Sequence, residues 1–304
     1  MKQKFRNGTV VELPNGQDRF LGTLYGSAWG RLLLKPLTHP TVSRAAGALL
    51  STRASRVLIG PFIRKNNIDM SPFEPVRYES YNDFFSRNIL PSARPVDGDP
   101  RHLISPCDSK LTVLPVSAEG RFTIKHTEYS VASLLKDQAL AAEYEGGTLL
   151  IFRLTVDDYH RYCYVADGIR GPSVSVPGVL HTVNPIANDY FPIYKENARE
   201  YCVLHTQGFG DILMMEVGAL LVGKIVNHAL PAQVHRGQEK GHFHFGGSTV
   251  ILLLKSGAAE IDPDIVRNSQ EGYETVVKYG EKIGSAASAP QSCNPPGLMF
   301  NSVF

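Results

Sequence analysis

The spacing of apolar residues changes near residue 95. Between residues 17 and 93, apolar positions recur three and four apart, as in RAAGALLSTRASRVLIG (44–60) and YNDFFSRNIL (81–90), which is typical of helices that pack one face on a core. The turn-forming segment RPVDGDP (94–100) then marks a boundary. Beyond it, short runs rich in β-branched and aromatic residues alternate with Gly, Pro, Asp and Asn, which predicts strands.

These runs predict a β-rich core after a helical region. The predicted strands are KLTVLPV, RFTIKH, TLLIFRL, YCYVAD, PSVSVPGVL, YCVLHTQ, ILMMEVGALLVGKIV and STVILLLK. One helix is expected at VASLLKDQALAAEYEGG (131–147), ended by its two glycines. We therefore predict an α+β fold with a mostly helical region at 1–95, a mainly antiparallel β-sandwich or barrel-like core at 96–284, and a Ser/Ala/Pro-rich, disordered tail at 285–304.

Composition narrows the function. Thirty-one basic and twenty-nine acidic residues give a net charge of +2, too balanced to indicate nucleic-acid binding. The four cysteines share no CxxC spacing, so we expect neither a zinc site nor disulfides, and a reducing, cytoplasmic location fits.

The N-terminus lacks the pattern of a secretory signal. No apolar run reaches the 18 residues of a membrane span, but apolar residues at helical spacing in 20–37, flanked by Arg19 and Lys35, predict a helix that either docks on the core or lies on a membrane surface.

The stretch GHFHFGGSTVILLL (241–254) is the most informative for chemistry. Two glycines precede Ser248 at the start of an apolar strand, and they leave the Gly247 carbonyl open to attack by the serine hydroxyl. By itself such a segment is also a common tight turn. A nucleophilic serine needs a base oriented by a third group. Candidates are His160 in DDYHRYC (157–163) and Asp108 in SPCDSK (105–110), although a structural histidine and an Asx-turn would explain them as well.

Seven motifs together resemble the phosphatidylserine decarboxylases, in the same order along residues 68–284. They are NDFFSRNILPSARP (82–95), SPCD (105–108), DYHR (158–161), VNP (183–185), ENARE (196–200), EVGALLVGKI (216–225) and GGST (246–249). The resemblance implies a proenzyme in which Ser248 attacks the Gly247 carbonyl, so that the chain splits into a β subunit (1–247) and an α subunit (248–304) that stay associated.

The same resemblance implies the chemistry that follows cleavage. Ser248 would become a covalent pyruvoyl group, which replaces a diffusible cofactor, and the enzyme would convert phosphatidylserine in an anionic membrane to phosphatidylethanolamine and CO2. The protein would then lie peripherally on the membrane surface. His160 would supply the proton that replaces the lost carboxyl group, and Asp108 would orient the base of self-cleavage.

One position departs from the family pattern. The family commonly carries a second histidine after DYHR that serves as the base of self-cleavage, whereas this chain has Cys163 there. Either His160 serves both steps, or the Cys163 thiolate acts as the base, or maturation is slow or lost; we favour His160, because a thiol is only slightly ionised at neutral pH. Two rival functions remain: a decarboxylase of another serine lipid, and a β-sandwich binding module that no longer cleaves itself.

Overall fold

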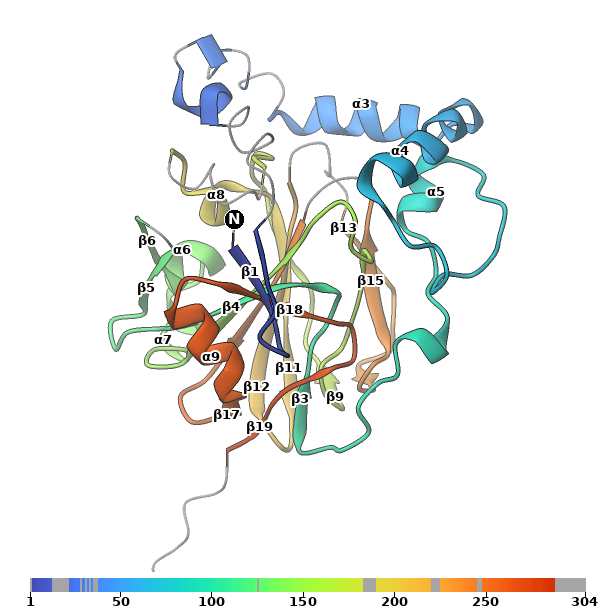
Figure 1. Cartoon of the computed structure of the whole chain (residues 1–304). Helices are drawn as coiled ribbons and strands as arrows, with labels where there is room; N and C mark the ends of the chain where they lie inside the picture. Colours follow the sequence, from blue (N-terminus) through green and yellow to red (C-terminus); the bar gives the residue numbers. More distant parts are fainter. Residues whose placement is uncertain are drawn as a thin grey trace, which may run out of the picture.

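An eleven-stranded sheet forms the centre of the molecule (Figure 1). The computed structural model describes residues 2–12, 22–27, 29–30, 32, 34, 38–124, 126–182, 190–219, 225–244 and 248–287. Ten strands follow the order β14-β9-β11-β12-β16-β7-β4-β18-β1-β2, and β10 pairs with β11. Their bounds are β1 Lys2–Phe5, β2 Val10–Glu12, β4 Ser109–Pro115, β7 Thr148–Leu154, β9 Gly168–Arg170, β10 Val174–Val176, β11 Arg199–Thr206, β12 Gly210–Val217, β14 Gln233–Val234, β16 Ser248–Leu254 and β18 Glu274–Val277.

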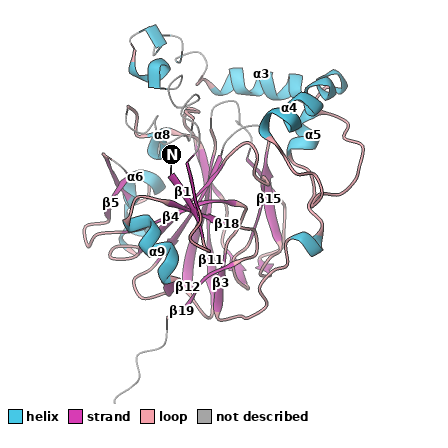
Figure 2. Cartoon of the chain, viewed as in Figure 1, coloured by secondary structure: helices cyan, strands magenta, loops and turns pink. Residues whose placement is uncertain are grey.

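The described pairs of this sheet are antiparallel apart from β1 with β18. The strand order runs from β14 at one edge to β2 at the other, so the sheet is open rather than a closed barrel. Some helices gather at one end of the molecule, and others lie beside the strands (Figure 2). The predicted α+β class and the mainly antiparallel core are therefore confirmed.

Strand β16 is central, and the sheet carries a hydrophobic core on each face. All seven residues of β16 are buried. Because neighbouring side chains in a strand point to opposite faces, Val250 and Leu252 belong to one core and Ile251 and Leu253 to the other. Three smaller sheets complete the β structure, formed by β13 (Ile225–Asn227), β15 (Glu239–Phe243) and β8 (Arg161–Cys163); by β17 (Ala259–Ile261), β19 (Lys282–Ala286) and β3 (His102–Ile104); and by β5 (Arg121–Ile124) and β6 (Thr127–Ser130).

Short helices make up most of the described part of the N-terminal region after residue 38. They are α3 (Pro40–Leu50), η1 (Arg53–Leu58), α4 (Ile59–Asn66), α5 (Tyr81–Phe85) and η2 (Pro91–Ala93). Helix α5 is capped by Ser80, whose side chain accepts a hydrogen bond from the amide of Asp83. None of the described helices is long and apolar enough to cross a membrane.

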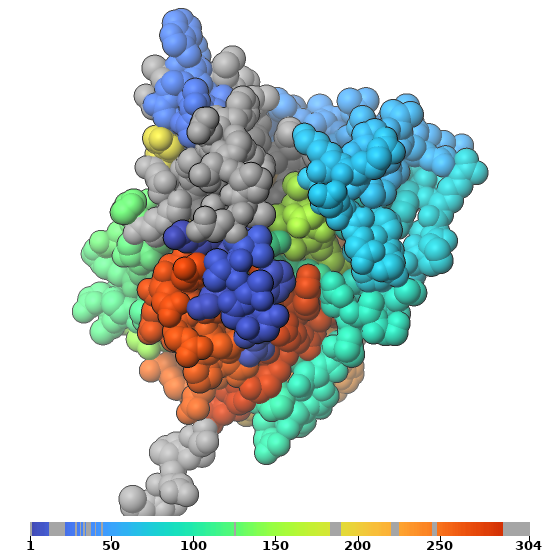
Figure 3. Space-filling model, in the orientation of Figure 1, coloured from blue at the N-terminus to red at the C-terminus, as the bar shows by residue number. Residues whose placement is uncertain are grey.

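The first residues of the chain differ from the prediction. Instead of helix, β1 and β2 form a hairpin at the sheet edge, and β1 pairs in parallel with β18 near the other end of the chain. Figure 3 accordingly shows the blue N-terminal strands against the orange and red C-terminal segment. The short alternation of Lys2–Phe5 gave no strand signal strong enough to outweigh the helical spacing that follows it.

The helix predicted at 131–147 is two helices, α6 (Val131–Leu135) and α7 (Gln138–Ala142). Lys136 ends α6 in the left-handed conformation with φ 57°, and the Asp137 side chain caps α7 by accepting from the Leu140 amide at 3.0 Å. Two further helices, α8 (Ile193–Glu196) and α9 (Pro263–Gln270), interrupt the strands. Strand β19 extends to Ala286, two residues into the predicted tail, and residues 288–304 lie outside the described residues.

Candidate active site

Ser248 and His160 meet in the interior of the protein. Both side chains are fully buried, and Ser248 Oγ lies 3.4 Å from His160 Nδ1. The other ring nitrogen, Nε2, lies 2.9 Å from the Thr155 carbonyl oxygen. Because a carbonyl can only accept, Nε2 carries the hydrogen and Nδ1 presents its lone pair to the serine hydroxyl. This is the tautomer that a general base for Ser248 requires.

Strand pairing and a ring contact hold the histidine in this place. His160 immediately precedes β8, and its carbonyl accepts from the Phe243 amide of β15 at 3.0 Å. Phe85 of α5 covers the imidazole, with ring centroids 4.1 Å apart. Burial, together with the nearby positive charge of Arg87, lowers the pKa of His160 to about 3. The imidazole is therefore neutral throughout the physiological pH range, and its Nδ1 lone pair is free to accept a hydrogen bond from the serine hydroxyl.

A buried network fixes the Thr155 turn that orients His160. Lys110 Nζ donates to both carboxylate oxygens of Asp158, at 2.7 and 2.6 Å, and to Thr155 Oγ1 at 2.6 Å. The Thr155 amide in turn donates to Asp158 at 2.7 Å. Asp158, the first residue of the DYHR motif, thus holds the turn whose carbonyl sets the histidine tautomer. The sequence motif contained this residue, but its spacing alone gave it no role.

Asp108 lies in a different set of contacts. Its carboxylate accepts two hydrogen bonds from Arg94, at 2.8 and 2.6 Å, and one from the Tyr279 amide at 2.9 Å, and Lys278 Nζ lies 3.4 Å away. Burial favours the neutral acid, but Arg94 and Lys278 outweigh it and hold the pKa of Asp108 below its usual value. None of the hydrogen bonds described for Asp108 reaches His160, and its role in orienting the base stays a prediction.

The hydrogen bonds described for Cys163 do not include Ser248. The Cys163 Sγ lies 4.0 Å from the Ser105 carbonyl oxygen. Burial raises the pKa of the Cys163 thiol to about 12, although a hydrogen bond with the Tyr279 side chain partly opposes this. The thiol is therefore protonated at neutral pH and poorly suited to act as a base. The other half of the expected cleavage bond, Gly247, lies outside the described residues.

Arg87 is a candidate that the sequence analysis missed. Arg87 is 2% exposed, and its guanidinium stacks on Phe73 and Phe84, 4.1 and 4.9 Å from the ring centroids. Burial lowers the pKa of Arg87 to about 10, which still leaves it cationic at neutral pH. Its Nε and Nη2 atoms are buried without a hydrogen-bond partner, and no described acidic side chain forms an ion pair with it. An unpaired buried cation is costly, so this one is a candidate receptor for an anion.

Fold and site together define a class of protein: an α+β chain in which a buried histidine faces a serine at the start of a central strand, directly after two glycines. The sequence profile described as "Phosphatidylserine decarboxylase" matches residues 81–285. This chain therefore belongs to the phosphatidylserine decarboxylase family, as its motifs indicated.

Curated proteins of this family are similar to the chain over most of its length. A protein of Clostridium acetobutylicum named phosphatidylserine decarboxylase proenzyme 2 is 46% identical over 271 residues, which cover 89% of this chain and 92% of the relative. Phosphatidylserine decarboxylase proenzymes of Ruminiclostridium cellulolyticum and Desulfitobacterium hafniense are each 40% identical over 273 residues, which cover 88% of this chain and 91% and 92% of the relatives.

Proposed function

We propose that this chain cleaves itself between Gly247 and Ser248 and then converts phosphatidylserine to phosphatidylethanolamine and CO2. Family membership supports the reaction. The observation that carries the proposal is the buried pair of Ser248 Oγ and His160 Nδ1, 3.4 Å apart with the imidazole in the accepting tautomer. This pair supplies the activated nucleophile with which self-cleavage begins.

Self-cleavage follows from the chemistry of this pair. His160 Nδ1 takes the hydroxyl proton while Ser248 Oγ attacks the Gly247 carbonyl carbon, and the peptide bond is exchanged for an ester. Elimination across the Cα–Cβ bond of Ser248 releases residues 1–247 with a free carboxylate. Water then adds to Cα of the remaining unsaturated residue and ammonia leaves, so that the fragment 248–304 begins with a pyruvoyl group.

Strand β16 accounts for the association of the two products. It pairs with β7 from Ser248 to Leu254 and with β12 from Thr249 to Leu254, and all seven of its residues are buried. Cleavage alters backbone atoms only at residue 248, so residues 249–254 would keep their pairing with both neighbouring strands. The α subunit would therefore stay in the sheet of the β subunit.

The residues at this position fit a pyruvoyl group. Such a group would supply the electron sink that decarboxylation of an amino acid needs. The chain itself excludes water by full burial of position 248 and presents His160 Nδ1 to the same point. An anionic substrate beside His160 would raise the pKa of the imidazole, which allows Nδ1 to carry the proton that replaces CO2. Arg87 would bind a substrate carboxylate or phosphate through its unpaired Nε and Nη2 atoms.

We further propose that the helical region docks on an anionic membrane. The helices and helical turns of this region carry five exposed large apolar side chains, termed here the apolar face: Trp29 (80% exposed), Leu32 (58%), Leu49 (68%), Val57 (76%) and Leu58 (46%). Exposed Arg64 and Lys65 at the end of α4 add positive charge. Figure 1 draws the helical turns within 22–34 and α3 at the same end of the molecule.

Helix α3, which carries Leu49 of the apolar face, is connected to the candidate active site by α5. Asn82 Nδ2 donates to the Gly47 carbonyl at 3.0 Å and to Ser51 Oγ at 2.9 Å, while Phe85 of the same helix covers His160. In the 20–37 stretch, Tyr25 and Leu34 are buried in the core, whereas Trp29 and Leu32 are exposed and would be available to contact a membrane. Phe20, Leu21 and Leu33 lie outside the described residues.

The deciding experiment is mass spectrometry of the purified protein together with CO2 release from phosphatidylserine vesicles. We expect fragments 1–247 and 248–304, the second with a blocked N-terminus, and a single inactive chain for Ser248→Ala. An intact wild-type chain would instead support the binding module, and activity only on another serine lipid would support the rival enzyme.

Membrane docking is tested separately by flotation with anionic vesicles. The Trp29→Glu/Val57→Glu double variant should cleave itself normally but stay with the soluble fraction. The matched control is Ile169→Glu, which changes another apolar residue, 49% exposed on β9, and should float like wild type. Equal flotation of all three proteins would refute the docking proposal.

A further inference from the structure

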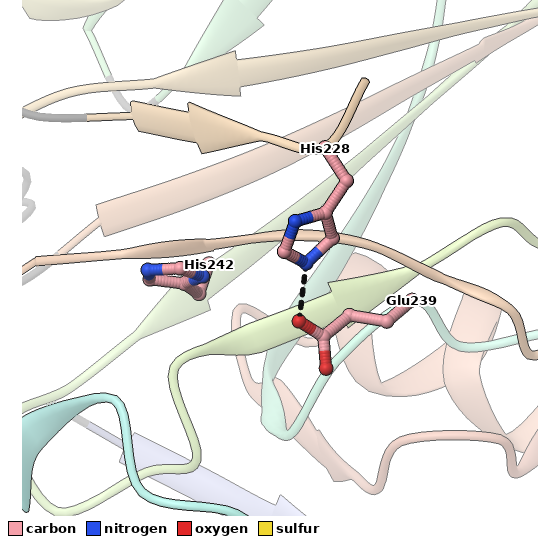
Figure 4. Close-up of side chains that lie close together, drawn as sticks. All are labelled: His228, Glu239 and His242. Atoms are coloured by element: carbon pink, nitrogen blue, oxygen red, sulfur yellow. Dashed lines mark hydrogen bonds and ion pairs between the residues drawn. The ribbon is translucent and has the colours of Figure 1, made fainter. Parts of the chain in front are cut away.

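Strand pairing gathers two histidines and a glutamate outside the site described above. His228, Glu239 and His242 each offer one ligand atom, and these atoms lie within 4.8 Å of one another (Figure 4). His228 Nε2 and Glu239 Oε1 are 2.6 Å apart, and the His242 ring centroid lies 5.9 Å from that of His228. The spacing of the cysteines predicted no metal site, but this cluster uses none of them.

A β-bulge explains why these three residues share one face. In a regular strand, Glu239 and His242 would point to opposite faces because they are three residues apart. The register of β15 against β8 shifts between Glu239 and Gly241, which lets Lys240 turn inward to Glu216, 2.6 Å away, and returns Glu239 to the face of His242.

The third member comes from the neighbouring strand. Val226 of β13 pairs directly with His242 of β15, so the two side chains lie on the same face. His228 lies two residues beyond Val226 and its amide donates to the Lys240 carbonyl at 2.9 Å. Its side chain is therefore the diagonal neighbour of His242 across the two strands.

The chemistry of the cluster suits a borderline transition metal. Two imidazoles and a carboxylate form a common three-ligand set for Zn²⁺, with a fourth position left open. His242 Nδ1 is shielded from solvent and has no hydrogen-bond partner among the described residues. Glu239 Oε1 also accepts from Arg161 Nη1 at 2.7 Å. This guanidinium competes with a cation, so the affinity should be lower than that of a site without it.

We propose that His228, Glu239 and His242 bind one divalent transition metal ion, such as Zn²⁺ or Ni²⁺. The site is separate from Ser248 but tied to it: the residue after His242 donates its amide to the His160 carbonyl at 3.0 Å. A bound ion would link β13 to β15 directly before the cleavage segment. It should therefore stabilise the folded chain.

The test uses the untagged full-length Ser248→Ala precursor, stripped with a chelator, and titrates Zn²⁺ by calorimetry and Co²⁺ by visible absorption. We expect one saturable site and a Tm that rises with Zn²⁺. His228→Ala and His242→Ala should each weaken binding at least about tenfold and abolish the Tm shift. The His228 side chain is 37% exposed, so its replacement should leave the fold intact.

The matched control is His205→Ala in the same background. His205 Nδ1 pairs with Asp211 at 2.7 Å but belongs to no described cluster of three ligands, so its loss should leave Zn²⁺ affinity unchanged. A precursor that binds no Zn²⁺, or His228→Ala and His242→Ala variants that bind as tightly as the precursor, would overturn the proposal. The precursor carries out no decarboxylation, so this result is independent of the proposed enzymatic activity.

Discussion

Replacing His160 with glutamine should nearly stop self-cleavage. Glutamine can still donate to the Thr155 carbonyl, but it offers Ser248 no basic nitrogen. With a pKa of about 3, only about one His160 side chain in 10⁴ is protonated at pH 7, so almost every molecule holds the base in its active form. Since a positioned general base contributes roughly 10²–10⁴ in rate, we expect cleavage of His160→Gln to slow by that factor.

The Cys163→Ser variant separates this explanation from the thiolate alternative. With a pKa of about 12, only about one thiol in 10⁵ is ionised at pH 7. Removing it should leave the cleavage rate within about threefold of wild type, since general-base catalysis would lose nothing. Both variants are similar in size to the residues they replace, which limits disturbance of the core.

The assay is a pulse–chase in cell-free translation, with precursor and fragments quantified over time from pH 5 to pH 8. The wild-type rate should be flat over this range, because His160 stays neutral throughout. Wild-type-like cleavage by His160→Gln would refute the assignment of the base, and loss of cleavage in Cys163→Ser would transfer the role to the thiol.

Three further predictions concern the surroundings of this pair. Arg87→Gln should raise KM for phosphatidylserine about 10–100-fold, the worth of a hydrogen bond to a charged group, yet leave cleavage at Ser248 intact; an unchanged KM would argue against an anion receptor. Asp108→Asn should lower the free energy of unfolding, by breaking the buried pair with Arg94, by about 3–5 kcal/mol, while cleavage persists in the molecules that fold; folded protein that fails to cleave would show that Asp108 acts on the base. In the uncleaved Ser248→Ala chain, unfolded His160 protonates below pH 6.5 whereas folded His160 stays neutral down to about pH 3, so stability falls as pH drops through this window. From pH 6.5 to pH 5 the loss should be about 1.6 kcal/mol, because the slope reaches about 1.4 kcal/mol per pH unit only well below pH 6.5; urea unfolding measures it relative to a chain that also carries His160→Gln.

The central strands β7 and β16 could be predicted from the sequence because they are buried on both faces. TLLIFRL and STVILLLK correspond to β7 and, without its final lysine, to β16, since long apolar runs between turn residues leave few alternatives. The break at Lys136 was not readable, because a lysine carries no local signal for a left-handed conformation. Nor was the pairing of β1 with β18, which depends on residues about 270 positions apart and on the closure of the whole sheet.

The site was predictable only where a motif named the residue. Ser248 and His160 stand in GGST and DYHR, and the fold brings them together. Arg87 also lies within the motif NDFFSRNILPSARP (82–95), but an arginine is usually a solvated surface charge. Only its burial against Phe73 and Phe84 distinguishes it. The cluster of His228, Glu239 and His242 depends on a bulge and on a neighbouring strand, neither of which has a signature in the spacing.

The contacts around Cys163 and His160 suggest how this chain can carry a cysteine at position 163, where the family commonly has a histidine. Asp108 and Cys163 both meet Tyr279, whose amide donates to the carboxylate and whose side chain contacts the thiol. The carboxylate is already fully engaged by Arg94, whereas His160 is oriented by a backbone carbonyl that Asp158 and Lys110 hold in place. In the described contacts, the Thr155 carbonyl therefore orients His160 without a second imidazole. We therefore expect His160 to act as the base of self-cleavage, with Cys163 as a buried packing residue of β8.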